Sequence, residues 1–246
     1  MEQEKIEEIR FVKYPMKMRN QIVFSREFLP SAKLVYAFIL YMQEYNEDFS
    51  PSSKFMERRF GISQPTFSKS VVALEKFGYI EIVKNTNCKT KNTIKIIWDK
   101  IYDTMFTMLP NCIINTDVYT NDQKLFLILL CNLSKAAYGG KIYTSRSVLS
   151  VYKSMKGMGV GENSVYARIK ELSDPESGFI NCLDIIDGSV YINTDVLLLI
   201  SDRCISSFEN AMQTKIKYPI YTKPKKGDFY IDLEAKKIRK RKNGNN

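Results

Sequence analysis

Between residues 61 and 82 the apolar positions first repeat with the period of a helix and then alternate as in a strand. Phe67, Val71 and Leu74 stand at i, i+4 and i+7, so they form one apolar stripe along a helix. Gly78 ends this pattern, and the residues after it are rich in β-forming side chains. The stretch therefore predicts a helix that packs through its apolar stripe and runs directly into a strand.

The residues that precede this helix have the chemistry of a turn between two helices. Gly61 suits the positive φ that closes one helix, and Pro65 is tolerated in the first turn of the next. Ser63 is expected to cap that second helix by accepting a backbone N–H group. A shorter helix is predicted over residues 51–60, with Ser50 as its cap. Helix, glycine turn, helix and strand in this order indicate a helix-turn-helix with a β-wing.

Further elements complete this first unit. The hydrophobic pattern predicts a scaffolding helix over residues 31–45, after a short strand at residues 21–25. Beyond the second helix it predicts two strands, at residues 79–85 and 93–98, and the polar loop between them is the wing. Two lysines on this loop suit contact with phosphate groups better than the reading of bases.

The same order of elements then recurs. A short linker helix is predicted over residues 100–111, and an amphipathic helix like that of the first unit is predicted over residues 162–173. The second wing has the clearer turn, because Asp187-Gly188 between two β-rich runs is a strong signal for a tight hairpin. The positions that match the apolar stripe of the first unit are Val165, Ile169 and Leu172.

Three stretches of the first unit are informative through their residue identities as well as their periodicity. They are Phe49-Ser-Pro-Ser52, Arg59-Phe-Gly-Ile-Ser63 and Ala73-Leu-Glu-Lys-Phe-Gly-Tyr-Ile80. They resemble the winged-helix domains of phage and plasmid replication initiators and of helix-turn-helix regulators. The resemblance covers residues 11–98 and, more loosely, residues 112–195. It implies a protein that binds repeated sequences at a replication origin and represses its own gene as a homodimer. One departure is the slightly acidic second unit, because the second domain of such initiators generally provides strong origin contacts.

The predicted fold is mostly α with small β-wings, an α+β architecture of two tandem winged-helix domains joined by a short helix and followed by a basic C-terminal tail. The last basic run of the tail is expected to be disordered, since it cannot bury itself. It is interpreted as an arm that follows phosphates, and the alternative is a solvated tail that aids solubility. The expected boundaries are an acidic N-terminal extension at residues 1–10, winged-helix domain 1 at 11–99, a linker helix at 100–111, winged-helix domain 2 at 112–200, and a C-terminal helix and basic tail at 201–246.

The charge distribution indicates nucleic acid as the partner. The 246-residue chain has a formal net charge of +10 and a pI near 9.2. Residues 11–99 carry fourteen basic and eight acidic side chains, and residues 223–246 carry nine basic and three acidic ones. Residues 111–200, in contrast, carry eight basic and nine acidic ones. The first unit and the tail are therefore expected to attract an acidic partner.

The residue types that most catalytic and metal sites need are scarce. The chain has no histidine, and its five cysteines include no Cys-x-x-Cys pair, so no metal site and no cofactor is predicted. The glycine run at residues 157–161 follows a predicted helix, whereas a dinucleotide-binding loop would follow a strand. We therefore expect a binding protein and not an enzyme. No signal peptide or membrane span is predicted, which favours a cytoplasmic protein with reduced thiols and no membrane partner.

The candidate site is a set of basic and polar side chains for double-stranded DNA. Those on the second helix of the first unit are expected to enter a major groove, and those on the first helix and the wing to hold phosphates. The matching helix of the second unit, predicted over residues 162–173, has two open interpretations. It contacts DNA, or it serves in dimerisation or in binding another protein. The candidate DNA-binding residues are Lys54, Arg58, Arg59, Ser63, Gln64, Thr66, Lys69, Lys76, Lys89, Lys91, Asn163, Ser164, Tyr166, Lys170, Lys225, Lys226, Arg239, Lys240, Arg241 and Lys242.

Sequence-specific binding to double-stranded DNA at a phage or plasmid replication origin is the leading hypothesis. A transcriptional regulator or repressor without a replication role is an open alternative. A second class is a winged-helix interaction module that assembles replication or transcription machinery and touches nucleic acid little. Clustered direct repeats with unwinding on binding would favour initiation, and a single promoter palindrome would favour regulation. Mobility shifts with genomic fragments would distinguish both from the interaction module.

Overall fold

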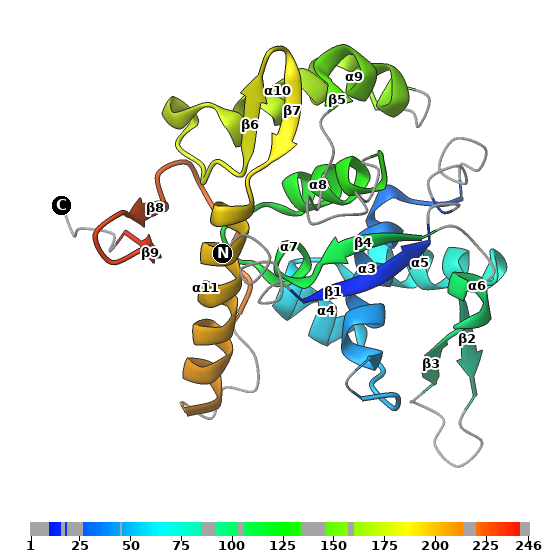
Figure 1. Cartoon of the computed structure of the whole chain (residues 1–246). Helices are drawn as coiled ribbons and strands as arrows, with labels where there is room; N and C mark the ends of the chain where they lie inside the picture. The colour runs from blue at the N-terminus through cyan, green and yellow to red at the C-terminus, as the bar shows by residue number, and fades with distance from the viewer. Residues whose placement is uncertain are drawn as a thin grey trace.

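The computed structural model describes residues 10–15, 18, 27–44, 46–84, 92–102, 106–133, 146–156, 160–213 and 220–241. Over these residues the protein is a mostly helical α+β structure with several small antiparallel strand pairs (Figure 1), as predicted at this level. Among the described helices, none combines the length and the apolar composition needed to cross a lipid bilayer. We call residues 10–110 the first half and residues 111–241 the second half.

Three helices and a strand pair make up most of the first half. Strands β2 and β3 pair antiparallel, with Ile80 opposite Ile96. The helices and strands predicted between residues 31 and 98 are confirmed, with small shifts at their ends, whereas the strand expected at residues 21–25 lies outside the described residues. The elements are α3 (Pro30–Gln43), α4 (Ser53–Phe60), α5 (Gln64–Lys76), β2 (Ile80–Val83) and β3 (Thr93–Ile96).

The helix caps differ from those predicted. Ser52, and not Ser50, caps α4, because its side chain accepts the backbone N–H three residues later with an N···O distance of 3.1 Å. The Ser50 hydroxyl instead accepts the backbone N–H of Ile94 at 2.9 Å and so ties the loop before α4 to β3. Ser63 stands at the start of α5, but its hydroxyl makes no capping bond and lies 3.0 Å from that of Thr66. The type of residue favours a cap at each position, and the local geometry selects which one forms.

Two turns have the backbone conformation that their residues predict. Gly61 has φ of 63°, in the left-handed region, and its N–H closes the last turn of α4 by donating to the Glu57 carbonyl at 2.8 Å. Asp187 and Gly188 have φ of 49° and 70°, as in the tight hairpin turns that fit the twist of paired strands. These positions fix the sharp change in chain direction before α5 and between β6 and β7, two strands at residues 183–186 and 189–192.

The second half repeats the order of helices and a strand pair. Strand β7 lies between β5 and β6 in a three-stranded antiparallel sheet. The helix predicted over residues 162–173 and the hairpin around Asp187 are confirmed. The elements are α7 (Asn111–Asn115), α8 (Asn121–Leu133), β5 (Arg146–Ser147), α9 (Val148–Lys156), α10 (Glu162–Ser173), the short 3-10 helix η1 (Pro175–Ser177), β6 (Leu183–Ile186) and β7 (Ser189–Ile192).

The linker helix predicted over residues 100–111 is wrong at residues 106–110. In the described part of this range, residues 100–102 belong to α6 (Asp99–Tyr102), residues 106–110 form β4 (Phe106–Pro110), and residue 111 begins α7. Strand β4 pairs antiparallel with β1 (Phe11–Pro15), which the sequence pattern did not predict. The apolar spacing before Pro110 fits a helix as well as a strand, and pairing with a strand from the start of the first half decides between them.

A long helix and a last strand pair form the C-terminal region. Helix α11 (Thr194–Gln213) follows β7 almost directly, so it begins before the expected boundary at residue 200. Strands β8 (Phe229–Asp232) and β9 (Lys237–Lys240) pair antiparallel beside α11 (Figure 1). The hairpin is thus an ordered part of the second half.

The expected disorder of the basic tail is therefore wrong up to residue 241. Phe229 and Ile238 are buried and give the hairpin an apolar side. From α11, the Arg203 guanidinium carbon lies 4.7 Å from the centroid of the Phe229 ring, and Nη1 donates to the Ile238 carbonyl at 3.4 Å. The high density of basic residues hides this apolar pair, so charge counting alone cannot predict the packed hairpin.

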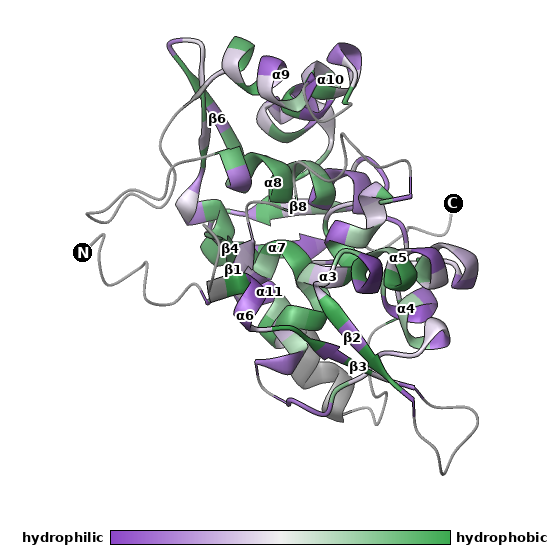
Figure 2. Ribbon diagram, turned by 90° about the vertical axis from the view of Figure 1, so that its right-hand side faces the viewer, coloured by the Kyte–Doolittle hydropathy of each residue, from purple (hydrophilic) through white to green (hydrophobic). Residues whose placement is uncertain are grey.

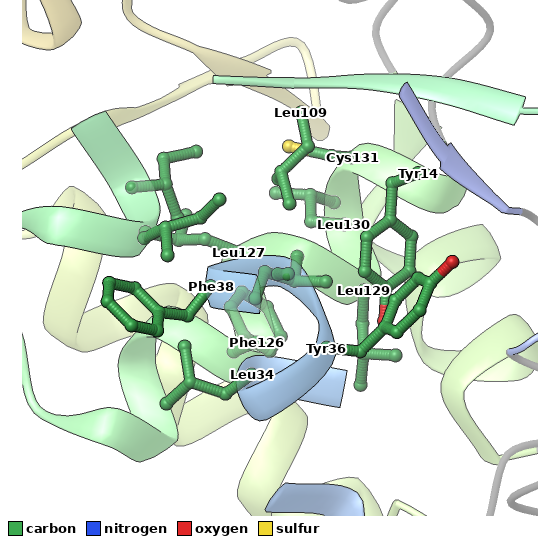
Figure 3. Packing of buried hydrophobic residues seen from close by; sticks show 14 of the residues in the cluster. Tyr14, Leu34, Tyr36, Phe38, Leu109, Phe126, Leu127, Leu129, Leu130 and Cys131 are labelled. Carbon is green, nitrogen blue, oxygen red and sulfur yellow. The ribbon is translucent and has the colours of Figure 1, made fainter. Parts of the chain in front are cut away.

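Helices α3 and α8 pack against each other at the centre of the molecule. Figure 3 shows Leu34 and Phe38 of α3 beside Phe126 and Leu127 of α8, and all four side chains are buried. Figure 2 shows α8 as largely hydrophobic, and α9, α10 and β4 also contact it. The two halves therefore share one hydrophobic core, and their relative placement is part of the fold.

Candidate nucleic-acid interface

Helix α5 has one buried face and one exposed face. The predicted apolar stripe is confirmed, because Phe67, Val71 and Leu74 are at most 8% exposed. Val72, on the opposite side, is 60% exposed, so the middle of the outer face is open among the described residues. The exposed side chains of α5 are Gln64, Pro65, Ser68, Lys69, Val72, Glu75 and Lys76, and the Glu75 carboxylate accepts the Ile82 backbone N–H at 3.2 Å.

The inner side of α5 packs against α3 and α4. These two helices are joined in turn by the Phe60 ring of α4, which meets the Phe38 ring of α3 edge to face with centroids 4.5 Å apart. The Ser70 hydroxyl donates to the Thr66 carbonyl at 2.8 Å and lies 3.3 Å from the Ser31 hydroxyl of α3. These contacts fix the helix on its scaffold, so the outer face is presented by a rigid element.

Four of the predicted basic side chains are exposed on the first half. Lys54 and Arg58 lie on α4, and Lys69 and Lys76 lie on α5. Lys76 forms an ion pair with Glu27, in which both side chains are about 60% exposed. A pair this exposed is worth at most about 1 kcal/mol, so a phosphate group can replace the carboxylate. The structure therefore brings these four cations to two adjacent helices.

Arg59 is a correction to the predicted phosphate contacts. Its side chain is 5% exposed, and its Nη2 donates to the Asn115 carbonyl of α7 at 2.9 Å. The guanidinium carbon lies 5.2 Å from the centroid of the Phe60 ring, and burial lowers the pKa of the group. Arg59 joins the two halves of the molecule and does not face solvent, because its guanidinium is directed at the Asn115 carbonyl of α7.

A second buried cation lies close to Arg59 and is missing from the predicted site. Lys124 of α8 is fully buried, and its Nζ lies 5.3 Å from the centroid of the Phe60 ring without a hydrogen-bond partner among the described residues. Burial, followed by the charge of Arg59, lowers its pKa to about 7. No signal in the sequence marks Lys124 as buried, apart from its place in an otherwise apolar helix.

The turn between α4 and α5 is held from the C-terminal part of the chain. We call residues 220–228 the strap. The Tyr221 backbone N–H donates to the Arg58 carbonyl at 2.6 Å, and its ring lies against Gly61, where an added Cβ would stand 2.6 Å from Cδ1. Asn121 of α8 donates from Nδ2 to the Phe60 carbonyl at 2.5 Å. The last carbonyls of α4 are therefore satisfied by groups from the second half.

The other end of the strap is fixed to the second half. The Gly227 N–H donates to the Gly178 carbonyl at 2.6 Å. A Cβ on Gly178 would stand 3.1 Å from the Cβ of Lys226, so the two segments are in close contact there. The strap thus runs from the turn between α4 and α5 to the segment that links α10 to β6.

Strands β2 and β3 contribute further exposed charges. Glu81 of β2 stands opposite Lys95 of β3, so this cross-strand pair is largely neutral as a unit. Lys84 follows β2 and is exposed, and the sequence reasoning did not select it because it lies just before the predicted loop. The predicted contacts Lys89 and Lys91 lie outside the described residues.

The predicted contacts of the second half lie together on α10. Asn163, Ser164, Tyr166 and Lys170 are all exposed, while Val165, Ile169 and Leu172 are buried as predicted. The glycine run before α10 is described only at residues 160 and 161. Helix α10 therefore presents a polar face that contains one aromatic ring.

The basic side chains of the C-terminal region are exposed but held on the hairpin and strap. Arg239 forms an ion pair with Asp232 at 2.6 Å, and the ammonium of Lys240 lies 5.8 Å from the ring centroid of Phe229. The guanidinium carbon of Arg241 lies 5.7 Å from the ring centroid of Tyr230. These are positions on a folded surface and not on a free arm. Of the remaining candidates, Lys225 and Lys226 are exposed on the strap, and Lys242 lies outside the described residues.

The thiols in the described residues have little reactive character. Cys112, Cys131 and Cys182 are buried and free, and Cys204 is half-buried and free. Burial raises the pKa of Cys182 and Cys204 to about 12, so thiolate is scarce near neutral pH. Within the described ranges, no three acidic or cysteine side chains gather as metal ligands would. The chemistry that this surface offers is that of exposed cations, amides and rings.

Comparison with known proteins adds no family to this description. No family model, no curated protein and no solved structure matches the chain.

Proposed function

We propose that the protein binds double-stranded DNA with sequence preference through the exposed face of α5. In this proposal each half acts as a winged helix, and α5 is the reading helix of the first. A major groove about 12 Å wide admits one α-helix, and the side chains of its outer face then meet base edges. Lys54 and Arg58 on the adjacent helix would hold phosphates on the flanks.

The open outer face of α5 is the observation that carries this proposal. Gln64 and Lys69 are exposed one and a half turns apart, and amide and ammonium groups of this kind pair with adenine and guanine edges. Val72 gives the same face an apolar point that can meet a thymine methyl group.

A selection of bound sequences from a random duplex pool, followed by binding measurements with Lys69→Ala, tests the reading role. One base-reading contact is worth about 1–3 kcal/mol, so the variant should lose about 5- to 150-fold discrimination at one position of the selected site. Lys237→Ala, on the exposed side of β9, is the matched control and should keep the preference. An unchanged preference in Lys69→Ala would remove α5 from this role.

The salt dependence of binding tests the electrostatic part separately. The exposed cations that flank or lie on α5 are Lys54, Arg58, Lys69, Lys76 and Lys84. If each neutralises one phosphate, log affinity should fall against log salt with a slope of about −4 to −5. A slope near zero would contradict phosphate contact by this surface.

We extend the proposal to a role at a replication origin, and this step rests on the resemblance of residues 49–52, 59–63 and 73–80 to initiator domains. An initiator should bind clustered direct repeats and open neighbouring base pairs, which chemical probing of unpaired thymines detects. A transcriptional regulator should bind a promoter site and leave the duplex closed. Binding to a single palindrome without opening would decide for the regulator.

A further inference from the structure

Helices α9 and α10 each have one exposed face, and the two faces meet at a pair of tyrosines. Four side chains on each helix stand at i, i+3, i+4 and i+7, the spacing that places residues on one side of a helix. All of them are exposed except Tyr152, which is half-buried. This α9–α10 face consists of Leu149, Tyr152, Lys153 and Lys156 on α9, and Asn163, Tyr166, Ala167 and Lys170 on α10.

The charge of the α9–α10 face differs from that of its surroundings. The face carries three lysines, and its one acidic neighbour along α10 is the exposed Glu162, four residues before Tyr166, although residues 111–200 as a whole have more acidic than basic side chains. The acidic residues of α10 are Glu162, which begins the helix, and Glu171, which forms an ion pair with Arg168. The α9–α10 face is therefore a local positive patch on a slightly acidic half.

The two tyrosines form a stacked pair within this patch. Their ring centroids lie 6.0 Å apart with an interplanar angle of 28°, and the Lys156 ammonium lies 5.8 Å from the centroid of the Tyr152 ring. Tyr166 is 40% exposed, so part of its ring is in contact with water. Packing of α10 does not need this ring, because Val165 and Ile169 already cover the core side.

We propose that the α9–α10 face binds single-stranded nucleic acid, with an unpaired base stacked on Tyr166 and the three lysines on the backbone phosphates. Aromatic rings within a positively charged surface are the means by which proteins bind unpaired strands without base-specific contacts. A duplex does not fit the exposed ring in this way, because its bases stack on one another and present only their edges.

This site is separate from the face of α5, since it lies on the other half of the molecule. It adds an unpaired-strand ligand to the proposed duplex ligand, and it stands whether or not α5 reads a duplex. The two proposals are therefore tested with different ligands and different variants.

Fluorescence anisotropy of the full-length protein with labelled oligothymidylate and oligouridylate of about 15 nucleotides tests the proposal. Stacking of one base is worth about 1–3 kcal/mol, so Tyr166→Ala should weaken binding by about 5- to 150-fold. Tyr166→Phe keeps the ring and should bind as the wild type does. Lys237→Ala, on the exposed side of β9, should leave the affinity for both oligonucleotides unchanged. The oligonucleotide that binds with the higher affinity shows whether the preferred strand is DNA or RNA.

A second variant tests the same surface without removing a ring, so that a folding defect in Tyr166→Ala would not be mistaken for a loss of binding. Lys153→Gln combined with Lys170→Gln removes two exposed charges, and should reduce the salt slope for oligothymidylate by about 1.4 in magnitude. Absence of binding by the wild type at low salt would overturn the proposal. Equal losses in Tyr166→Ala and Tyr166→Phe would also overturn it, because the contact would then belong to the hydroxyl group and not to a stacked base.

Discussion

At the scale of single residues, the contact between the two halves contains two buried cations beside one ring. Arg59 and Lys124 both lie about 5 Å from the centroid of Phe60, one from each half of the molecule. Arg59 has a carbonyl partner, whereas the Lys124 ammonium has no hydrogen bond among the described residues. A buried ammonium without a partner destabilises the fold while it is charged.

This arrangement predicts a dependence of stability on pH. The pKa of Lys124 is about 7 in the folded protein, against 10.5 for an unperturbed lysine. Below pH 7 the Lys124 side chain is protonated in both the folded and the unfolded protein, so the full cost of burying its charge lowers the stability. Above pH 7 Lys124 loses its proton in the folded protein but keeps it in the unfolded protein. The free energy of unfolding should therefore rise with pH from about 7, by up to about 1.4 kcal/mol for each unit. Denaturation with urea between about pH 6 and pH 8 measures this slope, because at higher pH the thiols that are buried in the folded protein ionise in the unfolded state, near pH 8.5, and oppose it.

Lys124→Met tests the origin of that slope. Methionine keeps the length of the side chain and removes the charge, so the variant should be more stable than the wild type at pH 6 to 7 and should lack most of the rise. Lys54→Met removes an exposed ammonium from α4 and should leave the rise in place. If Lys124→Met were less stable than the wild type at every pH and its free energy of unfolding still rose with pH, a group other than Lys124 would cause the rise.

At the scale of elements, helices and strands that depend on neighbouring residues could be predicted from the sequence. Strands that depend on a partner far away in the chain could not. The apolar stripe of α5 and the Asp187-Gly188 turn specify their elements within a few residues. Strand β4 depends on pairing with β1, and the hairpin β8–β9 depends on packing against α11. Neither of these contacts is visible in a local pattern, although a helix was expected within residues 201–246.

The candidate site follows the same division. Gln64 and Lys69 are exposed as predicted, because the stripe of α5 defines which face is buried. Arg58 and Arg59 are equivalent in the sequence, and the position of α7 decides that Arg59 is buried. The strap is also invisible to a pattern search, since its contact with the turn of the first half joins segments far apart in the chain.

Gly61 links the turn to the strap and gives a test at this scale. Alanine at Gly61 is strained by φ of 63° and would also press on the Tyr221 ring, 2.6 Å from the added Cβ. Gly188→Ala is a matched control, because Gly188 has φ of 70° but nothing within 4 Å of an added Cβ. Strain alone costs about 1–2 kcal/mol, and the overlap should add about 1–3 kcal/mol in Gly61→Ala. Urea denaturation of both variants measures how much free energy of unfolding each one loses. Equal losses would mean that the Tyr221 ring moves aside from the added Cβ at little cost.

At the scale of the whole molecule, the shared core and the strap make the two halves one unit. Helices α3 and α8 bury apolar side chains against each other, so neither half has a complete core alone. The strap closes the other side, from the end of α4 to the segment after α10. The face of α5 and the α9–α10 face are thereby held at a fixed separation. A ligand that contacts both faces would have to match that spacing.

Removal of residues 220–246 tests whether the C-terminal region is structural. A free basic arm would leave thermal stability unchanged when removed and would weaken only binding. The structure predicts a lower melting temperature instead, because the truncation frees the Arg58 and Gly178 carbonyls and exposes the side of α11 that Phe229 and Ile238 cover. Loss of two carbonyl partners and of this apolar contact should cost a few kcal/mol.

The full-length variant with Lys225→Gln, Lys226→Gln and Arg241→Gln separates charge from structure. It keeps the backbone contacts of the strap, so its melting temperature should match the wild type, while its affinity for non-specific duplex should fall and its salt slope should flatten. A truncated protein that melts like the wild type would show that the strap does not stabilise the turn before α5. Loss of sequence preference in the truncated protein, with preference kept in the charge variant, would show that the strap acts on DNA binding by holding α5 in place. The C-terminal region would then determine how the reading helix is presented without itself touching a base.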